Sequence, residues 1–248
     1  TEIMILLLGT TPDDILYIKN RMIMKEKGAV NKDEHFYFVG EYGGKEICMT
    51  YTGHSNIMSA VLTSYMIRKF NPYLVISIGS AQSASSNLNQ GDLFIAERVY
   101  IADLDYNNYT NLPLRDAIHM HPYYVSEEVY IKHFELLNSA TGNYKLVRGP
   151  VISVNNFVKE KAEAERIIAR QENYIEGPTV FDTEMGGIVA CCRFYGIPWL
   201  YLRSINYEIG KEEQLISFVR KGVEAQPRIG ELVEQLFIFL NTSLEESI

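Results

Sequence analysis

The sequence has little cysteine, and its three cysteines are badly placed for disulfides. Cys191 and Cys192 are neighbours in a segment predicted to be helical, and Cys48 lies alone in a predicted strand. Two adjacent thiols and one distant thiol cannot build a disulfide framework. This cysteine usage is typical of a reducing compartment, and we expect a cytoplasmic protein.

Basic runs and long apolar runs are also missing. The 23 lysines and arginines are scattered, and the net charge is −8. An acidic chain without a basic patch disfavours nucleic acid and anionic membranes as partners. The opening apolar run, Ile3 to Leu8, is far too short to cross a membrane, so it predicts a buried first strand. Small molecules and other proteins are the partner classes that remain.

The chain shows no internal repeat and no linker-like segment. With 248 residues, 47% of them hydrophobic, it can bury one large core, and we expect residues 1–248 to form a single domain. Apolar runs predict strands at 3–8, 36–40, 46–52, 74–79, 92–99, 146–154 and 199–205, and amphipathic patterns predict helices at 13–25, 55–70, 127–137, 158–171, 184–195 and 222–240. This alternation predicts a three-layer α/β/α fold with a mostly parallel mixed central sheet.

Residues 102–124 have no hydrophobic period and predict a long loop. Long loops in compact enzymes are often binding loops. His119 and His121 lie in this loop, but alternate histidines without a nearby acid or cysteine make a poor metal site. We expect no metal ion and no organic cofactor.

The most informative segment runs from Val180 to Asn206. Glu184 follows a short apolar run and begins a helix of small residues, and Arg203 lies near the end of the next apolar strand. A buried carboxylate facing a buried arginine is costly unless the pair holds a ligand or a polarised water. Because ligands of α/β proteins bind at strand ends, this pair predicts a site.

Four other positions have both a functional and a structural interpretation. Gly79 and Ser80 end a strand, where glycine lets a ligand approach and serine offers a hydroxyl, although many strands end this way only to turn the chain. His54 lies in a strand-to-helix turn, where a structural hydrogen bond is more common than catalysis. Phe157 follows a strand and either stacks on a planar base or belongs to the core.

Taken in order, these segments resemble the nucleoside phosphorylase superfamily, and most closely its 5′-methylthioadenosine/S-adenosylhomocysteine nucleosidases. The likeness covers nearly the whole chain. The segments that carry it are Gly9 to Asp14, Thr52-Gly53, Ser77 to Gln82 with Gly91-Asp92, Arg148 to Phe157, Asp182-Thr183-Glu184, and Arg203 to Tyr207. None is decisive alone, but six in this order are specific.

The resemblance implies a role for each matching position. Glu184 would hold the ribose hydroxyls, and Asp14 would act as general base on a water that Glu184 and Arg203 also surround. Phe157 would stack on the purine, and the backbone around Val158 would read its edge. The remaining substrate-binding positions would be Gly79, Ser80, Thr183 and His54. These groups suit a glycosidic bond that breaks through an oxocarbenium-like sugar.

Two positions favour water over phosphate as the nucleophile. The phosphorylases that this chain resembles carry arginines where Asp14 and Ser77 stand. Phosphorolysis needs such a cationic cradle, so the resemblance implies hydrolysis.

The leaving-group acid is the main departure from the family. Tyr207 stands where the family has an aspartate that protonates or hydrogen-bonds N7 of the purine, and Gln82 and Ser83 replace a glycine pair. Glu208 could swing in as the acid, or Asn206 could hydrogen-bond the base while the reaction stays slow. A third possibility is a pocket that has lost catalysis.

We therefore expect a cytoplasmic homodimer that hydrolyses an adenosine-type nucleoside such as 5′-methylthioadenosine or S-adenosylhomocysteine. The alternatives are a nucleoside phosphorylase and a non-catalytic nucleoside-binding or storage homologue. Methylthioadenosine, tested with and without phosphate, would distinguish them.

Overall fold

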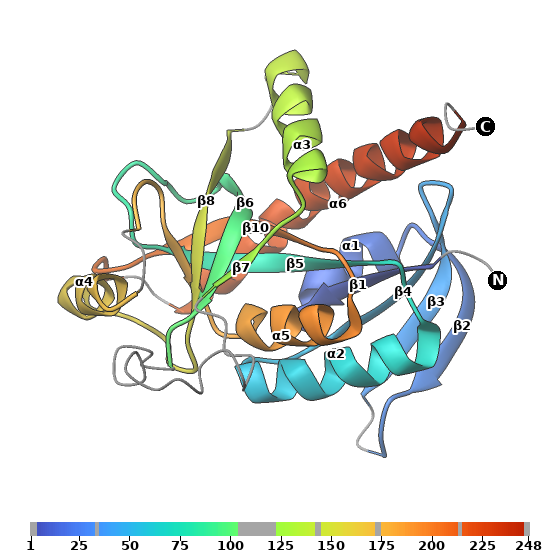
Figure 1. Ribbon diagram of the computed structural model, residues 1–248, viewed down its shortest axis with the longest axis horizontal. Helices are drawn as coiled ribbons and strands as arrows, with labels where there is room; N and C mark the ends of the chain where they lie inside the picture. The colour runs from blue at the N-terminus through green and yellow to red at the C-terminus, as the bar shows by residue number, and fades with distance from the viewer. Residues whose placement is uncertain are drawn as a thin grey trace, which may run out of the picture.

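A ten-stranded mixed sheet forms the middle of the molecule (Figure 1). The computed structural model describes residues 4–32, 35–103, 123–141, 145–171, 175–212 and 215–245. The predicted loop at 102–124, with His119 and His121, lies almost wholly outside the described residues. The strands are β1 (Met4–Gly9), β2 (Ile23–Ala29), β3 (Phe36–Tyr42), β4 (Lys45–Tyr51), β5 (Leu74–Ser83), β6 (Leu93–Ile101), β7 (Tyr123–Val125), β8 (Leu146–Ser153), β9 (Val180–Asp182) and β10 (Trp199–Glu208).

Parallel pairing brings several strand ends together at one edge of the sheet. β1 is parallel to both β4 and β5, and β10 is parallel to β5. Antiparallel pairs flank this centre, with β2 on β3 and β3 on β4 at one margin. The carboxyl ends of β1, β4, β5 and β10 therefore meet, which is where ligands of α/β folds bind.

Five strands close on themselves around this edge. β10 pairs with β6 and β5, β8 pairs with β6 and β9, and β9 pairs with β5. The last residues of β5 therefore lie side by side with the short strand β9 and with the last residues of β10. Side chains from all three strands can reach one ligand there.

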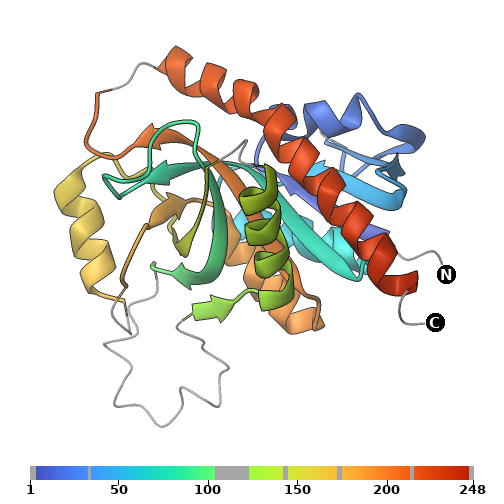
Figure 2. The same cartoon turned by 90° about the horizontal axis from the view of Figure 1, so that it is seen from above.

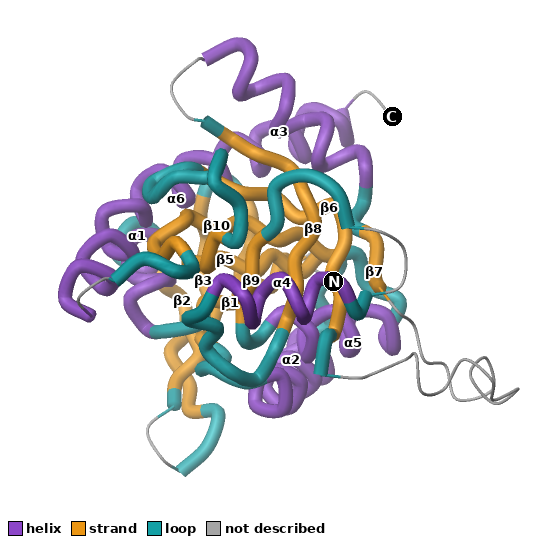
Figure 3. Tube along the Cα trace, turned by 90° about the vertical axis from the view of Figure 1, so that its left-hand side faces the viewer, coloured by secondary structure: helices purple, strands orange, loops and turns teal. Residues whose placement is uncertain are grey.

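Helices cover both faces of the sheet, which confirms the predicted three-layer fold. The helices α2 (Asn56–Phe70) and α5 (Met185–Tyr195) cover one face. The 3₁₀ helix η1 (Pro12–Ile15) and the helices α1 (Leu16–Lys19), α3 (Glu128–Thr141) and α6 (Leu215–Glu245) cover the other (Figures 2 and 3). The short helix α4 (Lys161–Ala169) packs on β8 and β9. Both faces of β1 are fully buried, because Ile5 packs with one helical layer and Leu6 with the other.

The predicted helix at 13–25 is wrong beyond residue 19. The chain instead forms the edge strand β2, which pairs antiparallel with β3. Most β2 side chains are exposed, so Met, Lys and Glu residues that favour helices occupy it without any cost in burial. Pairing with β3 decides the structure there, not local propensity.

Candidate active site

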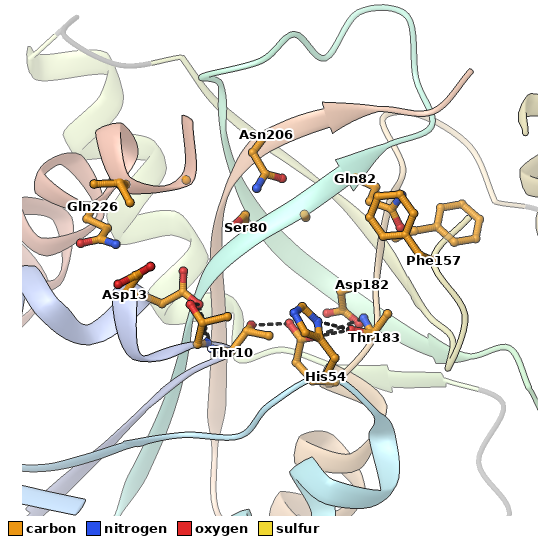
Figure 4. A pocket seen from close by; sticks show the side chains of 17 residues that line it. Thr10, Asp13, His54, Ser80, Gln82, Phe157, Asp182, Thr183, Asn206 and Gln226 are labelled. Carbon is orange, nitrogen blue, oxygen red and sulfur yellow. Dashed lines mark hydrogen bonds between the residues drawn. The ribbon is translucent and has the colours of Figure 1, made fainter. Parts of the chain in front are cut away.

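A cavity of about 150 Å³ opens at the carboxyl edge of the sheet (Figure 4). Its lining residues come from the segment after β1, the ends of β5, β9 and β10, the start of α5, the turn before α2 and one face of α6. The lining residues are Thr10, Thr11, Asp13, Asp14, His54, Ser80, Ala81, Gln82, Phe157, Phe181, Asp182, Thr183, Glu184, Asn206, Gly222, Val223 and Gln226.

The predicted pair of Glu184 and Arg203 is present and buried. Nη2 of Arg203 donates to Oε1 of Glu184 at 3.2 Å, and both side chains are almost fully shielded from solvent. Oε1 also accepts from Thr10 Oγ1 at 2.7 Å, and Oε2 accepts from the backbone N and the hydroxyl of Thr183 at 3.1 and 2.8 Å. Nη2 of Arg203 also donates to Ser77 Oγ at 2.7 Å. These bonds offset the cost of burying the two charges.

The turn before α2 holds the two threonines that bind Glu184. The backbone N of Gly53 donates to the carbonyl of Thr10 at 2.8 Å, and that of Ser55 donates to the carbonyl of Thr183 at 3.0 Å. Nδ1 of His54 lies 3.0 Å from Thr183 Oγ1, and its ring is exposed at the rim of the cavity. The contact fits the structural interpretation of His54, since the same threonine hydroxyl donates to Glu184.

Asp14 is held at the start of η1. Its Oδ2 accepts from the backbone N of Thr10 at 3.1 Å, and from the backbone N and hydroxyl of Thr11 at 2.7 and 3.0 Å. Burial raises the pKa of the Asp14 carboxyl, and the bond from the Thr11 amide and the charge of Arg203 partly oppose that rise. Gly79 makes room for this carboxyl: its φ is +144°, and a Cβ there would lie 3.2 Å from Asp14 Cγ.

A bulge in β10 determines which of its side chains reaches the cavity. Ile205 pairs with Ala81 and Tyr207 with Gln82, so Asn206 is the extra residue. Asn206 lines the cavity, and its Oδ1 is buried without a hydrogen-bond partner in the part of the chain that the structure describes.

The other two candidate positions for the acid lie outside the cavity lining. The Tyr207 ring is nearly buried and packs against the Phe157 ring, with 5.1 Å between ring centroids. Glu208 pairs with Lys211 and faces a separate hollow beside α4. Of the three residues proposed for contact with the leaving base, the structure therefore brings Asn206 to the cavity.

The remaining predicted positions divide between the cavity wall and its support. Ser80, Phe157 and Thr183 line the cavity. Val158 is fully buried behind the wall, and its carbonyl accepts from Gln82 Nε2 at 2.7 Å. The carbonyl of Val158, part of the backbone that the resemblance places at the purine edge, therefore already accepts one hydrogen bond from the protein.

Several cavity residues were not predicted as site residues, and three of them carry polar groups that can bear on a ligand. Asp182 Oδ1 accepts from Ser153 Oγ at 2.7 Å and from the backbone N of Met185 at 3.2 Å, while burial and the charge of Glu184 raise the pKa of Asp182 to about 7. Gln82 and Gln226 also line the cavity. Gln82 departs from the family pattern and Asp182 belongs to the matched Asp182-Thr183-Glu184 motif, so both gave a signal. Gln226 gave none, because α6 is far away in sequence.

The chemistry of the wall is anionic and amide-rich. Among the described lining residues none is lysine or arginine, and Arg203 stands behind Glu184. The carboxyl groups of Asp14 and Glu184 both line the cavity, and the charges of Arg203 and Glu184 both act on the Asp14 carboxyl. Such a group can orient and deprotonate a water and stabilise positive charge on a sugar.

Sequence comparisons identify one family. Residues 4–238 match the Phosphorylase superfamily. The 5′-methylthioadenosine/S-adenosylhomocysteine nucleosidase of Psychromonas ingrahamii is 25% identical over 237 residues, which cover 95% of this chain and 98% of the relative. That of Listeria monocytogenes serotype 4a is 24% identical over 215 residues, 86% of this chain and 89% of the relative.

Solved structures show the same fold at lower identity. The S-adenosylhomocysteine nucleosidase of Streptococcus pyogenes, in complex with 5-methylthiotubericidin, superposes with a TM-score of 0.81 at 18% identity and covers 96% of both chains. The futalosine hydrolase of Helicobacter pylori superposes with a TM-score of 0.78 at 20% identity and covers 94% of this chain and 96% of its own. The family match over nearly the whole length establishes that this chain belongs to the phosphorylase superfamily.

Proposed function

We propose that this protein is a purine nucleosidase that hydrolyses the N-glycosidic bond of an adenosine-type nucleoside, such as 5′-methylthioadenosine or S-adenosylhomocysteine. Its curated relatives are named for this activity and match it over most of their length. The observation that carries the proposal is the buried pair of Glu184 and Arg203 beside the Asp14 carboxyl at one cavity.

In this proposal the attacking group is water. Asp14 takes a proton from the water as its oxygen attacks C1′ of the sugar, and the electrons of the C–N bond leave with the base. Glu184 binds the ribose hydroxyls and stabilises the positive charge that develops on the sugar. Phe157, whose exposed fraction is 44%, stacks on the base.

The end of the cavity where Asn206 lies, which would hold the leaving base, favours slow hydrolysis. A protonated carboxyl near the leaving base is typically worth about 10²–10⁴ in rate, and Asn206 offers an amide instead. An amide can hydrogen-bond the base but cannot supply a proton, so the leaving base would take its proton from solvent. This observation also favours a second candidate, a nucleoside-binding protein without turnover.

The test uses 5′-methylthioadenosine and S-adenosylhomocysteine, each incubated with the purified protein with and without phosphate. We expect free adenine and free sugar at a rate that phosphate does not change, because the carboxyl of Asp14 stands where a phosphorylase needs a cation. Sugar 1-phosphate as the main product would establish a phosphorylase instead. Tight nucleoside binding without adenine release would establish the non-catalytic alternative.

The exposed face of α2 supports a homodimer. Four large apolar side chains at helical spacing, Ile57, Met58, Val61 and Tyr65, are 36–72% exposed on this helix. A stripe of this kind is typical of a surface that another protein covers. We propose that a second copy covers it, which sedimentation of the native protein would test.

The proposed location is the cytoplasm. All three cysteines are free, and Cys48 and Cys192 are buried, as in proteins of reducing compartments. Among the described helices, none is long and apolar enough to cross a membrane.

A further inference from the structure

Gln82 occupies a central position at the rim of the cavity. It lies near the end of β5, where its neighbours across the sheet are Phe181 on β9 and Tyr207 on β10. Its side chain is 4% exposed and lines the cavity. A nearly buried amide at a ligand cavity must find hydrogen-bond partners, either in the protein or in the ligand.

One hydrogen bond fixes the orientation of this amide. Nε2 of Gln82 donates to the carbonyl oxygen of Val158 at 2.7 Å. A carbonyl oxygen only accepts hydrogen bonds, so the nitrogen of the amide must face it and Oε1 must face away. The bond also uses one of the two lone pairs of the Val158 carbonyl oxygen and holds the Gln82 amide beside it. A ligand at this point therefore meets the glutamine amide next to that carbonyl.

The same bond places Gln82 beside the aromatic wall. Val158 follows Phe157 in the chain, and the Phe157 ring lines the cavity beside the Gln82 side chain (Figure 4). A planar base stacked on Phe157 would point an edge at the amide. The amide offers an acceptor, Oε1, next to the second N–H of Nε2. An edge that matches it carries an amine donor next to a ring-nitrogen acceptor, as adenine does.

We propose that Gln82 reads the edge of the base and selects a purine with an exocyclic amine. The inference rests on the proposed function, since it takes the ligand of the cavity to be a nucleoside or its base. Hypoxanthine would bring its carbonyl oxygen against Oε1, where two acceptors repel. Unsubstituted purine would leave Oε1 without a donor.

The experiment measures the dissociation constants of adenine, hypoxanthine and unsubstituted purine by calorimetry. The native protein should bind adenine about tenfold or more tightly than either competitor, the selectivity expected of one bidentate amide contact. Gln82→Met keeps the length of the side chain but removes the amide, and should reduce the preference for adenine to about threefold or less. Gln82→Leu makes the same comparison should the methionine variant lose its cooperative thermal transition.

Gln171 provides a matched control. Its Nε2 also donates to a backbone carbonyl, that of Ile167 at 2.8 Å, but just past α4 and away from the cavity. Gln171→Met should keep the native preference for adenine. Equal native affinity for the three bases, or native selectivity in both Gln82 variants, would overturn the role of Gln82 and leave the proposed function standing. A native protein that binds neither the bases nor methylthioadenosine would overturn both.

Discussion

At one end of the cavity the carboxylate of Glu184 accepts four hydrogen bonds, whereas at the other end Oδ1 of Asn206 is buried without a partner among the described residues. The first end is held in one geometry before any ligand binds. The second end gains a partner only when a ligand or water supplies a donor. Since a satisfied polar network holds one geometry, the Glu184 end is preorganised for chemistry on the sugar.

The two ends also differ in how the backbone builds them. Thr10, Thr183 and the turn at Gly53 are tied together by backbone hydrogen bonds, so the Glu184 end is braced from three segments. The other end depends on one bulged residue of β10 and on Gln82. A substitution at the braced end disturbs charge and fold together, whereas a substitution at the bulge changes mainly what the cavity offers a ligand.

The largest effect is expected from Glu184→Gln. The change leaves the guanidinium of Arg203 buried without its counter-charge, which typically costs about 3–5 kcal/mol of unfolding free energy. Turnover of methylthioadenosine should fall about a hundredfold or more, because the charge on the developing sugar cation is no longer stabilised. Urea denaturation and adenine release measure the two losses separately.

Glu160→Gln, at an exposed position before α4, is the matched control and should change neither quantity. A Glu184→Gln protein with native stability and native turnover would show that the braced end is not the catalytic end.

A smaller effect, in the opposite direction, is expected from Asn206→Asp. The new carboxyl would lie in the cavity at a buried position, where desolvation raises its pKa and keeps it protonated as a general acid. Turnover should rise by about tenfold, well short of the full range for such an acid, because Gln82 also departs from the family pattern. Adenine release at pH 6 to 8 gives the rate.

Tyr207→Asp is the comparison variant, because the sequence pattern places the family's acid at that residue. Its ring packs behind Phe157, so we expect a smaller gain from it than from Asn206→Asp. The reverse order would mean that the leaving base lies deeper, toward Tyr207, and that the bulge does not set the position of the acid.

The braced end was largely predictable from sequence, and the bulged end was not. Glu184 and Arg203 each follow or end an apolar run, so the rule that ligands bind at strand ends was enough to group them, and the family resemblance added Asp14. The same patterns located all the strands that meet at this edge except β9. Three residues are too few to show a period of two, so β9 escaped notice.

The bulged end depends on register, which one sequence does not reveal. A bulge between Ile205 and Tyr207 exchanges which of two neighbouring residues faces the cavity, and nothing in the residues themselves marks it. The bond from Gln82 to the Val158 carbonyl joins residues 76 positions apart. Contacts of this range appear only once the sheet order is known. The strand β2 is also determined by its pairing with β3, which overrides its helical propensity.

The smallest effect on ligand binding is expected from Asp182→Asn. This variant tests whether the buried Asp182 carboxyl supports the Glu184 end of the cavity. Burial raises the pKa of Asp182 to about 7 from a usual value near 4, so the native protein holds an extra proton between those two values. The raised pKa therefore stabilises the native state relative to the unfolded state, fully below about pH 4, and this contribution is lost as the pH rises through 7. Asparagine removes this titration while its oxygen keeps the bonds from Ser153 and Met185.

The free energy of unfolding of Asp182→Asn, relative to native, should accordingly increase by about 1 kcal/mol or more between pH 4.5 and pH 8. Asp13→Asn makes the same chemical change at an exposed residue of the rim and serves as the control. A relative stability that stays flat or decreases across this range would mean that Asp182 is ionised beside Glu184 throughout. The braced end would then hold two buried carboxylates against one arginine, and its preorganisation would have to come from a cation or bound water that compensates the second charge.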